Sequence, residues 1–519
     1  MKIKLLDCTL RDGGYINNWD FSSKAMNGIL NALESSNVEI IECGYLNAKK
    51  GKSKDSTLFD SLATVDMVLS TIETSAKRVI MINLGDYEVM LLKPKNETLI
   101  DGIRLAFHKK DLDIALREAK YIIELGYDLY FQPMVTKNYK DIEFLSMIEE
   151  INKINPYAFY IVDSFGSMTL DEFNKYLVLS NNNLNRAISL GYHSHNNMQL
   201  AFSNAVSMCS ANMQREIIID ASIYGIGRGA GNLNTELIAD YLNSSFAKNY
   251  NILPLLEIID EFLNSLMIKK PWGFSPAQYL SASFDCHPNY ATYLINKNTK
   301  HIVGVRNILE KLPLEKRNSF DKKYIEQLYM DSIFEIKKEI RGSLLIPKNK
   351  KILLVASGKS VNEYQDNIDK KIKSNDYLTI TLNHKPDFES DYYFFSNQKR
   401  FDEFSQKVKK DKIVITSNIF TKMDIDTVLD FKNLTFVDEN LVTNVAIVML
   451  NYLVSKSISN VEIVGLDGYQ IDTDNYNYEE SNIITDAKEL ILQNRILKES
   501  LDILKEKIDI EFITPTIFE

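Results

Sequence analysis

The stretch His193-Ser194-His195-Asn196-Asn197 contains two histidines with the spacing of metal ligands. In an extended segment, residues i and i+2 point to the same side, so His193 and His195 can present two imidazoles to one ion. Taken alone, such a pair fits a structural role equally well, in which one histidine caps a strand and the other is solvated. Two neutral imidazoles leave a divalent site short of charge, and a carboxylate such as Asp12, in DCTLRDGG at residues 7–14, would complete it. These nitrogen and oxygen donors favour Mn or Mg, with Co, Zn or Fe as alternatives.

Eight short runs rich in β-branched and aromatic residues supply strands that would position such a site. They occupy residues 3–8, 38–44, 78–84, 102–107, 127–133, 157–163, 187–193 and 216–223. Segments with helical spacing lie between them, and the interval from run to run is roughly the 30 residues of a βα unit. Eight consecutive units predict a (β/α)8 TIM barrel over residues 1–244, in preference to an open doubly wound sheet.

A barrel of this kind collects its chemistry at the carboxyl ends of its strands. Polar residues follow nearly every predicted strand: Asp7, Arg11 and Asp12; Glu42; His108; Gln132; Asp163 and Ser164; residues 193–197; and GIGRGAGN at 225–232. This recurrence is hard to obtain from loop solvation alone. The pattern therefore predicts a catalytic barrel with one site at this end.

The remainder of the chain divides in two. Residues 245–345 are mostly helical in pattern and are predicted to form an extension that closes on the barrel. After the basic stretch PKNKK, residues 346–519 resume strand and helix alternation, with strand candidates that include KILLV and residues 434–438, and predict a smaller Rossmann-like α/β domain. SGKS at 357–360 lacks the first glycine of a phosphate loop, and no GxGxxG is present.

Composition narrows the classes of function. The 519 residues are 45% hydrophobic and 25% charged, as in globular chains. The net charge of -10 argues against nucleic-acid binding. The four cysteines lack CxxC spacing, so a reducing cytoplasm is the simplest compartment. The longest apolar stretch, 445–454, is about half a membrane span, so no membrane association is expected. A homo-oligomer is expected.

Several separated motifs resemble one superfamily. DCTLRDGG, EIIECGY, VDSFG at 162–166, HSHNN and GAGN at 229–232 are similar to the DRE-TIM metallolyases, which include hydroxymethylglutaryl-CoA lyase. Over about residues 1–290 the pattern is most like the 4-hydroxy-2-oxovalerate aldolases. The resemblance implies Asp12, His193 and His195 as metal ligands, Arg11 as the group that stabilises an enolate oxygen, and Glu42 as the acid that orients Arg11.

The expected enzyme is a divalent-metal-dependent (class II) pyruvate aldolase, a carbon–carbon lyase. It would cleave or form a 4-hydroxy-2-oxo acid, from a 2-oxo acid and an aldehyde, through an enolpyruvate bound to the ion, with a sugar-type aldehyde as one option. Gln132 and Ser164 are predicted to contact the substrate together with Arg11. Two alternatives stay open. One is a Claisen-type acyl-CoA synthase of the isopropylmalate synthase type, and the other, less favoured, is a non-catalytic barrel.

One position departs from the aldolase pattern. The aldolases carry a histidine shortly after the Arg-Asp pair as the base for the 4-hydroxyl proton, and Tyr15 takes its place here. A phenol, with a pKa near 10, is a poor base. Other candidates for proton transfer are Tyr45, His108, His287 and Tyr290. Asn232 is predicted to contact the metal or its ligands, and Gly13 and Gly14 to form a tight turn.

The last resemblance concerns the C-terminal part. The order of ASGKS, LNHKP, FSNQKRF and VGLDG is similar to bacterial sialyltransferase-like Rossmann domains. This implies a nucleotide or sugar ligand near Ser357 to Ser360. A domain for oligomer contacts, or one that covers the barrel, is the alternative.

Overall fold

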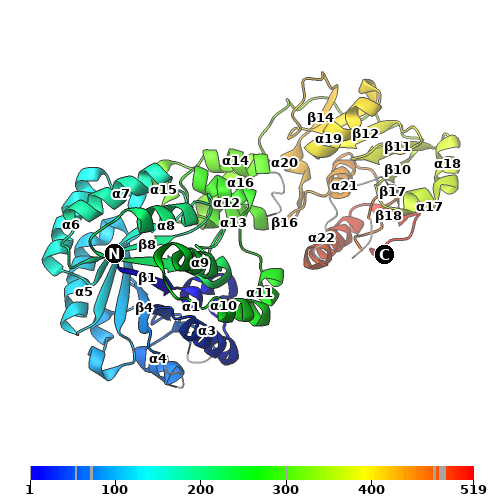
Figure 1. Ribbon diagram of the computed structural model, residues 1–519. Helices are drawn as coiled ribbons and strands as arrows, with labels where there is room; N and C mark the ends of the chain where they lie inside the picture. The colour runs from blue at the N-terminus through cyan, green and yellow to red at the C-terminus, as the bar shows by residue number, and fades with distance from the viewer. Residues whose placement is uncertain are drawn as a thin grey trace. The chain divides into compact units, whose positions relative to one another are not determined.

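The computed structural model describes residues 2–52, 55–70, 74–297, 302–438, 440–470, 475–477 and 487–519. The chain forms two compact units, Met1–Glu326 and Gln327–Glu519 (Figure 1). Within the described residues, no helix has both the length and the apolar character needed to cross a bilayer. The predicted boundaries at 244/245 and 345/346 stay predictions.

Eight parallel strands close a barrel in the first unit. They are β1 (Lys2–Asp7), β2 (Ile40–Leu46), β4 (Lys77–Asn83), β5 (Gly102–Phe107), β6 (Asp128–Pro133), β7 (Ala158–Asp163), β8 (Ser189–Ser194) and β9 (Glu216–Ala221). Neighbours pair in this order, and β1 pairs with both β9 and β2, which closes the sheet. The two-residue β3 (Leu58–Phe59) lies beside β2. The predicted TIM barrel is therefore confirmed.

Helices surround the barrel (Figure 1). They are α1 (Thr9–Asp12), α2 (Gly14–Asn17), α3 (Ser23–Ser35), α4 (Leu62–Leu69), α5 (Leu112–Glu124), α6 (Asp141–Ile154), α7 (Leu170–Asn183), α8 (Ala201–Ser210) and α9 (Thr235–Phe246). Helix α5 buries Ala115, Ala119 and Ile122, which recur at helical spacing on the face toward the strands. These faces and the outward side chains of the strands form one large apolar core.

The interior of the barrel changes from apolar to polar along the strands. Residues i and i+2 of a strand share a face, so each pair marks two successive interior layers. The pairs are Ile40 and Glu42 on β2, Tyr130 and Gln132 on β6, Gly191 and His193 on β8, and Ile218 and Asp220 on β9. The polar member is always nearer the carboxyl end. The polar layer therefore rests on a packed apolar floor.

A helical extension follows the barrel. Its elements are α10 (Leu253–Ile258), the π-helical η6 (Ile259–Leu263), α11 (Asn264–Lys269), α12 (Pro276–Ser283), α13 (Asn289–Asn296), α14 (Ile302–Glu310), α15 (Leu314–Arg317) and α16 (Lys322–Ile333). Asp285 accepts hydrogen bonds from Lys137 Nζ at 2.9 Å and from Ser167 Oγ at 2.8 Å. These bonds fix the extension to the loops that follow β6 and β7.

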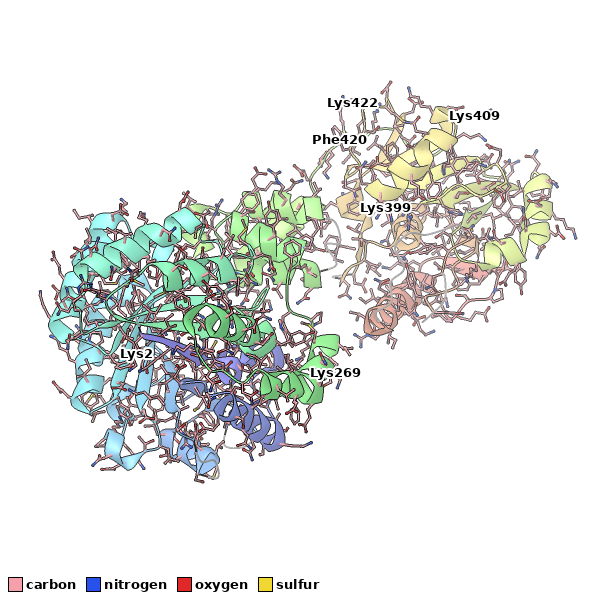
Figure 2. The ribbon with its side chains drawn as sticks, viewed as in Figure 1. Lys2, Lys269, Lys399, Lys409, Phe420 and Lys422 are labelled. Atoms are coloured by element: carbon pink, nitrogen blue, oxygen red, sulfur yellow. The ribbon has the colours of Figure 1, made fainter. Side chains whose placement is uncertain are left out.

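The second unit is built on an all-parallel sheet. Its strands, in spatial order, are β14 (Thr427–Leu429), β13 (Ile413–Thr416), β12 (Tyr392–Phe395), β11 (Tyr377–Leu382), β10 (Lys351–Val355), β17 (Asn460–Val464) and β18 (Asp509–Phe512). The helices are α17 (Ser360–Glu363), α18 (Gln365–Lys373), α19 (Gln398–Phe404), α20 (Phe431–Leu434), α21 (Val445–Ser455) and α22 (Ala487–Lys505). Charged side chains such as Lys409 and Lys422 stand on its surface (Figure 2).

Both faces of this sheet are covered. Leu354 belongs to an apolar cluster that contains the buried helix α21, and its neighbour Leu353 packs with Ile368 of α18. The predicted α/β architecture of this part is confirmed. The strand predicted at 434–438 is present in part as β15 (Phe436–Val437), but β15 pairs with β16 (Asn440–Leu441) in a separate two-stranded sheet and does not join the seven-stranded one.

Candidate active site

Buried charged side chains meet at the carboxyl ends of the barrel strands. Arg11 Nε donates to Glu42 Oε2 at 2.9 Å, and Arg104 Nη1 lies 2.9 Å from the same oxygen. Arg104 also pairs with Asp220 through Nη2. Burial alone would disfavour the charges, but Asp220 and Glu42 raise the pKa of Arg104, and Arg104 and His193 lower the pKa of Asp220.

His193 and Asp12 close these contacts into a ring. Asp220 Oδ2 lies 3.0 Å from His193 Nδ1. An ionised carboxylate only accepts, so Nδ1 carries a proton, and in a neutral imidazole this leaves the lone pair on Nε2. That Nε2 lies 3.5 Å from Asp12 Oδ2, and Asp12 Oδ1 lies 3.1 Å from Arg11 Nη1. His195 Nε2 also faces Asp12 Oδ2, at 3.9 Å. Both predicted histidine ligands thus face the same oxygen of Asp12.

The charge of this ring suits a divalent cation. With His193 neutral, the three carboxylates exceed the two guanidinium groups by one negative charge. Burial opposes ionisation of Asp12, but Arg11, His195 and His193 together lower its pKa. Burial lowers the pKa of His195 to about 3, so its imidazole is neutral. Asn232 donates to Asp12 Oδ2 at 2.9 Å, while its own buried Oδ1 has no partner among the described residues. Ionised carboxylate, neutral imidazole and a free amide oxygen fit a hard or borderline cation.

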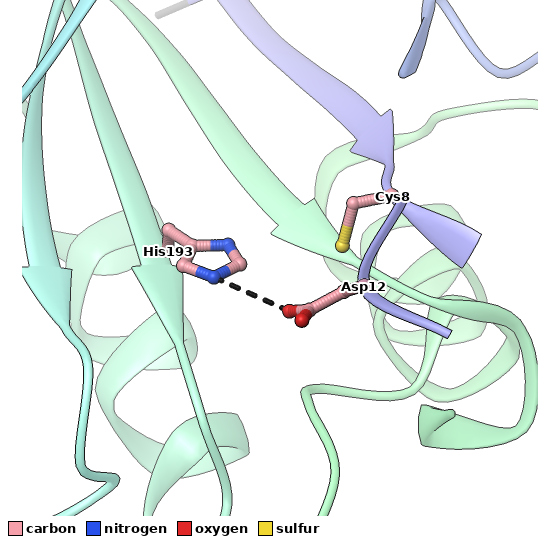
Figure 3. Close-up of side chains that lie close together, drawn as sticks. All are labelled: Cys8, Asp12 and His193. Carbon is pink, nitrogen blue, oxygen red and sulfur yellow. Dashed lines mark ion pairs between the residues drawn. The ribbon is translucent and has the colours of Figure 1, made fainter. Parts of the chain in front are cut away.

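Cys8 and His195 are the two candidates for a third metal ligand beside Asp12 and His193. One ligand atom each of Cys8, Asp12 and His193 lie within 4.8 Å of one another (Figure 3). Burial raises the pKa of the Cys8 thiol, whose Sγ donates to Ala221 O at 3.2 Å. A protonated thiol is a poor ligand. The neutral imidazole of His195 is therefore the better donor.

Gly13 and Gly14 form a turn between two short helices and leave space for neighbouring groups. Gly13 has helical angles, φ −59° and ψ −24°, and links the short helices α1 and α2. A Cβ on Gly13 would lie 2.5 Å from Thr9 O, and one on Gly14 would lie 2.0 Å from the Trp19 indole. Trp19 Nε1 donates to Arg11 O at 2.9 Å. The two glycines thus allow the packing that positions the backbone of Arg11.

A cavity of about 250 Å³ opens beside the ring. The predicted site residues that line it are Arg11, Tyr15, His108, Gln132, Ser164, His193 and His195. Tyr45, His287 and Arg228 line it as well, with Phe320 from the extension. No Asp or Glu is among the described residues of its wall. The wall of the cavity therefore carries positive charge, whereas the adjacent ring of buried side chains carries the net negative charge.

Gln132 and Ser164, the two predicted substrate contacts, are fixed by hydrogen bonds to neighbouring residues. The hydrogen-bond network orients the Gln132 amide so that its oxygen accepts from Arg104 Nε at 2.8 Å. Ser164 Oγ accepts from Val135 N at 2.9 Å. Val135 has a φ of 53°, a strained conformation for a β-branched residue, at the cavity wall. Both polar groups are thus fixed before a ligand binds.

Tyr290 is not brought to the cavity. Its side chain is fully buried within the extension. Its hydroxyl lies 2.7 Å from Lys316 O and 2.9 Å from Ser319 O, and accepts from Asp321 N at 3.0 Å. These backbone contacts use the hydroxyl, so the candidacy of Tyr290 for proton transfer is corrected to a structural role.

Four residues of the site were not expected from the sequence: Arg104, Asp220, Arg228 and Cys8. Two of them carried a usable signal. Arg104 stands inside GIRLAF and Asp220 inside EIIIDA, and both strands are otherwise almost wholly apolar. A charge inside such a run needs a buried partner.

The barrel is similar to a known protein family. Residues 2–259 match the family model described as HMGL-like. The barrel belongs to the HMGL-like family. This membership confirms the predicted relationship to the DRE-TIM metallolyases, and with it the prediction of an enzyme of the carbon–carbon lyase class. The match ends before the second unit begins.

Relatives of the HMGL-like barrel include two 4-hydroxy-2-oxovalerate aldolases. The one from Shewanella pealeana is 22% identical over 317 residues, which cover 60% of this chain and 91% of the relative. The one from Geobacillus genomosp. 3 is 25% identical over 273 residues, which cover 51% of this chain and 79% of the relative. A solved N-terminal domain of a candidate aldolase from Bacteroides vulgatus is 30% identical, with a TM-score of 0.49, and covers 58% of this chain and 99% of that chain.

Proposed function

We propose that the chain is a divalent-metal-dependent class II aldolase that cleaves or forms a 4-hydroxy-2-oxo acid, with pyruvate as the 2-oxo acid. The observation that carries this proposal is the ring of Arg11, Asp12, Glu42 and His193 with their buried partners at one wall of the cavity. The aldolase relatives support the same reaction class.

Asp12, His193 and His195 would hold the cation, with Mn or Mg the expected metals. When bound, it supplies Lewis-acid polarisation of the oxygens of the 2-oxo acid. Asp220 keeps His193 in the tautomer whose Nε2 is free to act as a ligand. Asn232 holds the Asp12 carboxylate in place.

Arg11 is suited to the charge that develops during bond cleavage. When the C3–C4 bond breaks, electrons move toward the keto oxygen of the pyruvate unit. Arg11 lines the cavity, and its Nε and Nη1 are held by Glu42 and Asp12. The remaining Nη2 is buried and has no partner among the residues that the structure describes. A preorganised donor of this kind is available to the enolate oxygen.

His108 is the best placed of the candidate bases. It follows β5, lines the cavity, and burial lowers its pKa, so the imidazole is neutral near pH 7. The Tyr45 hydroxyl donates to Asp86. Both ring nitrogens of His287 have partners, and burial lowers its pKa to about 3. We therefore assign the 4-hydroxyl proton to His108.

His108→Gln is expected to lower kcat for cleavage of 4-hydroxy-2-oxovalerate by roughly 10²- to 10⁴-fold, the usual contribution of a general base. A base must be unprotonated, so activity falls as the pH drops through its pKa. Because the His108 pKa is lowered, the acid limb of kcat/KM should lie below about 6.5, the ordinary histidine value. A pH profile of pyruvate release checks this, and an unchanged acid limb in the variant would exclude His108.

The overall proposal is tested by exchange of the pyruvate methyl protons in deuterated water, followed by NMR. The chelator-treated enzyme should show no exchange above the buffer rate, and addition of Mn should restore it. This measurement needs no knowledge of the aldehyde. A folded, Mn-loaded enzyme without exchange would contradict the proposal and direct the test to acyl-CoA enolisation.

A further inference from the structure

We propose that Arg228 forms an anion-binding subsite in the cavity, and that the aldehyde substrate carries a carboxylate or phosphate group. This inference rests on the proposed aldolase function. Arg228 lies in GIGRGAGN, after η5 (Ile223–Gly225), and lines the cavity.

The guanidinium of Arg228 is held in place without an acidic partner. Its Cζ lies 4.4 Å from the centre of the Tyr15 ring, and Nη1 lies 3.1 Å from His287 Nε2. Nε is buried and has no hydrogen-bond partner among the described residues. No carboxylate of the described residues forms an ion pair with Arg228. The side chain as a whole is partly exposed, and a partly desolvated guanidinium is stabilised by an anionic partner.

The two arginines of the cavity differ in charge balance. Arg11 forms ion pairs with Glu42 and Asp12, whereas no described carboxylate forms an ion pair with Arg228, whose charge only contributes to the lowered pKa of Asp12. The wall supplies no carboxylate. His287, which also contacts Arg228, is an imidazole and cannot supply a negative charge either. An anion on the substrate would therefore complete this wall.

The position of Arg228 favours binding of the half of the product that comes from the aldehyde. The pyruvate half must reach Arg11 and His193 in the ring. Arg228 instead contacts Tyr15, which is 39% exposed, and His287 of the extension. The contact with the exposed Tyr15 places Arg228 on the side of the cavity nearer to solvent. Tyr15, at the position where the aldolase pattern has a histidine, thus supports the guanidinium.

The size of the cavity limits the acceptor. The cavity has a volume of about 250 Å³ and must hold pyruvate together with the acceptor. We therefore expect a short aldehyde, with its charge at the end remote from the carbonyl.

The test compares two matched pairs of acceptors in pyruvate addition with Mn. Succinic semialdehyde is compared with butanal, and glyceraldehyde 3-phosphate with glyceraldehyde. The wild type should prefer the charged member of one pair by at least about tenfold in kcat/KM, since a hydrogen bond to a charged group contributes roughly 10- to 100-fold. The pair that shows the preference distinguishes carboxylate from phosphate.

Arg228→Gln should remove most of that preference, mainly through a higher KM for the charged aldehyde. Arg117→Gln, the same change at an exposed site on α5, should retain it. Tyr15→Phe should retain more of it than Tyr15→Ala, because the phenyl ring keeps the contact with the guanidinium.

Three results would overturn the subsite. The first is a wild-type enzyme that exchanges pyruvate protons but does not prefer either charged aldehyde. The second is a preference for the charged aldehyde that survives in Arg228→Gln. The third is an Arg228→Gln variant whose KM rises for pyruvate instead of for the aldehyde. Failure of the aldolase proposal itself is separate, because it appears as absent exchange with pyruvate alone.

Discussion

Arg11→Gln is expected to lower the Mn-dependent exchange of pyruvate methyl protons by roughly 10²- to 10³-fold, the usual cost of losing one oxyanion donor. Arg11 Nη2 is the donor without a partner at the cavity wall. Glutamine is shorter and uncharged, so it cannot place a cationic N–H there. The rate is followed by NMR in deuterated water at saturating Mn.

The fold should tolerate this change. Glu42 Oε2 is shared by Arg11 and Arg104, so removal of the first leaves the carboxylate paired with the second. The metal content should therefore stay within about twofold of the wild type, which distinguishes a lost donor from a lost metal site. Arg117→Gln on the exposed face of α5 provides the matched control. Exchange within about fivefold of the wild type in Arg11→Gln would remove Arg11 from the chemistry.

The barrel could be predicted because its strands carry a strong and local signal. Each strand is a short apolar run between polar segments, and the observed bounds of β5, Gly102–Phe107, coincide with the predicted run. Strand β3 has only two residues and produces no such run. The run at 434–438 had the composition of a strand, but the chain after it turns back within a few residues, so β15 pairs locally with β16. Composition does not determine which partner a short segment finds.

The candidate site could be predicted in part, for the same physical reason. Asp12, His193 and His195 stand next to strand ends and have the spacing of ligands, which a local pattern can reveal. The contact between Arg104 and Asp220 joins residues 116 positions apart, and only the closed barrel shows it. Tyr290 fails as a candidate because backbone carbonyls use its hydroxyl, and no sequence pattern reports that.

Arg104→Met should cause the largest loss of stability. Arg104 is fully buried and pairs with both Glu42 and Asp220. Methionine fills similar space but leaves Asp220 with only His193 and Tyr160 as partners. Removal of one partner from a buried ion pair typically lowers the free energy of unfolding by about 3–5 kcal/mol. Urea unfolding measures the loss, and Arg117→Met should lie within about 0.5 kcal/mol of the wild type.

A double variant can distinguish whether the loss of stability comes from an unpaired carboxylate or from lost packing. If the cost comes from the unpaired carboxylate, Arg104→Met combined with Asp220→Asn should recover part of the stability, because the remaining group is then neutral. If the cost comes from a cavity or from lost contacts with the Tyr160 ring, the double variant should be no more stable than the single one. Recovery would show that the balance of charges stabilises the ring. The same ion pairs orient Arg11 and His193 toward the cavity.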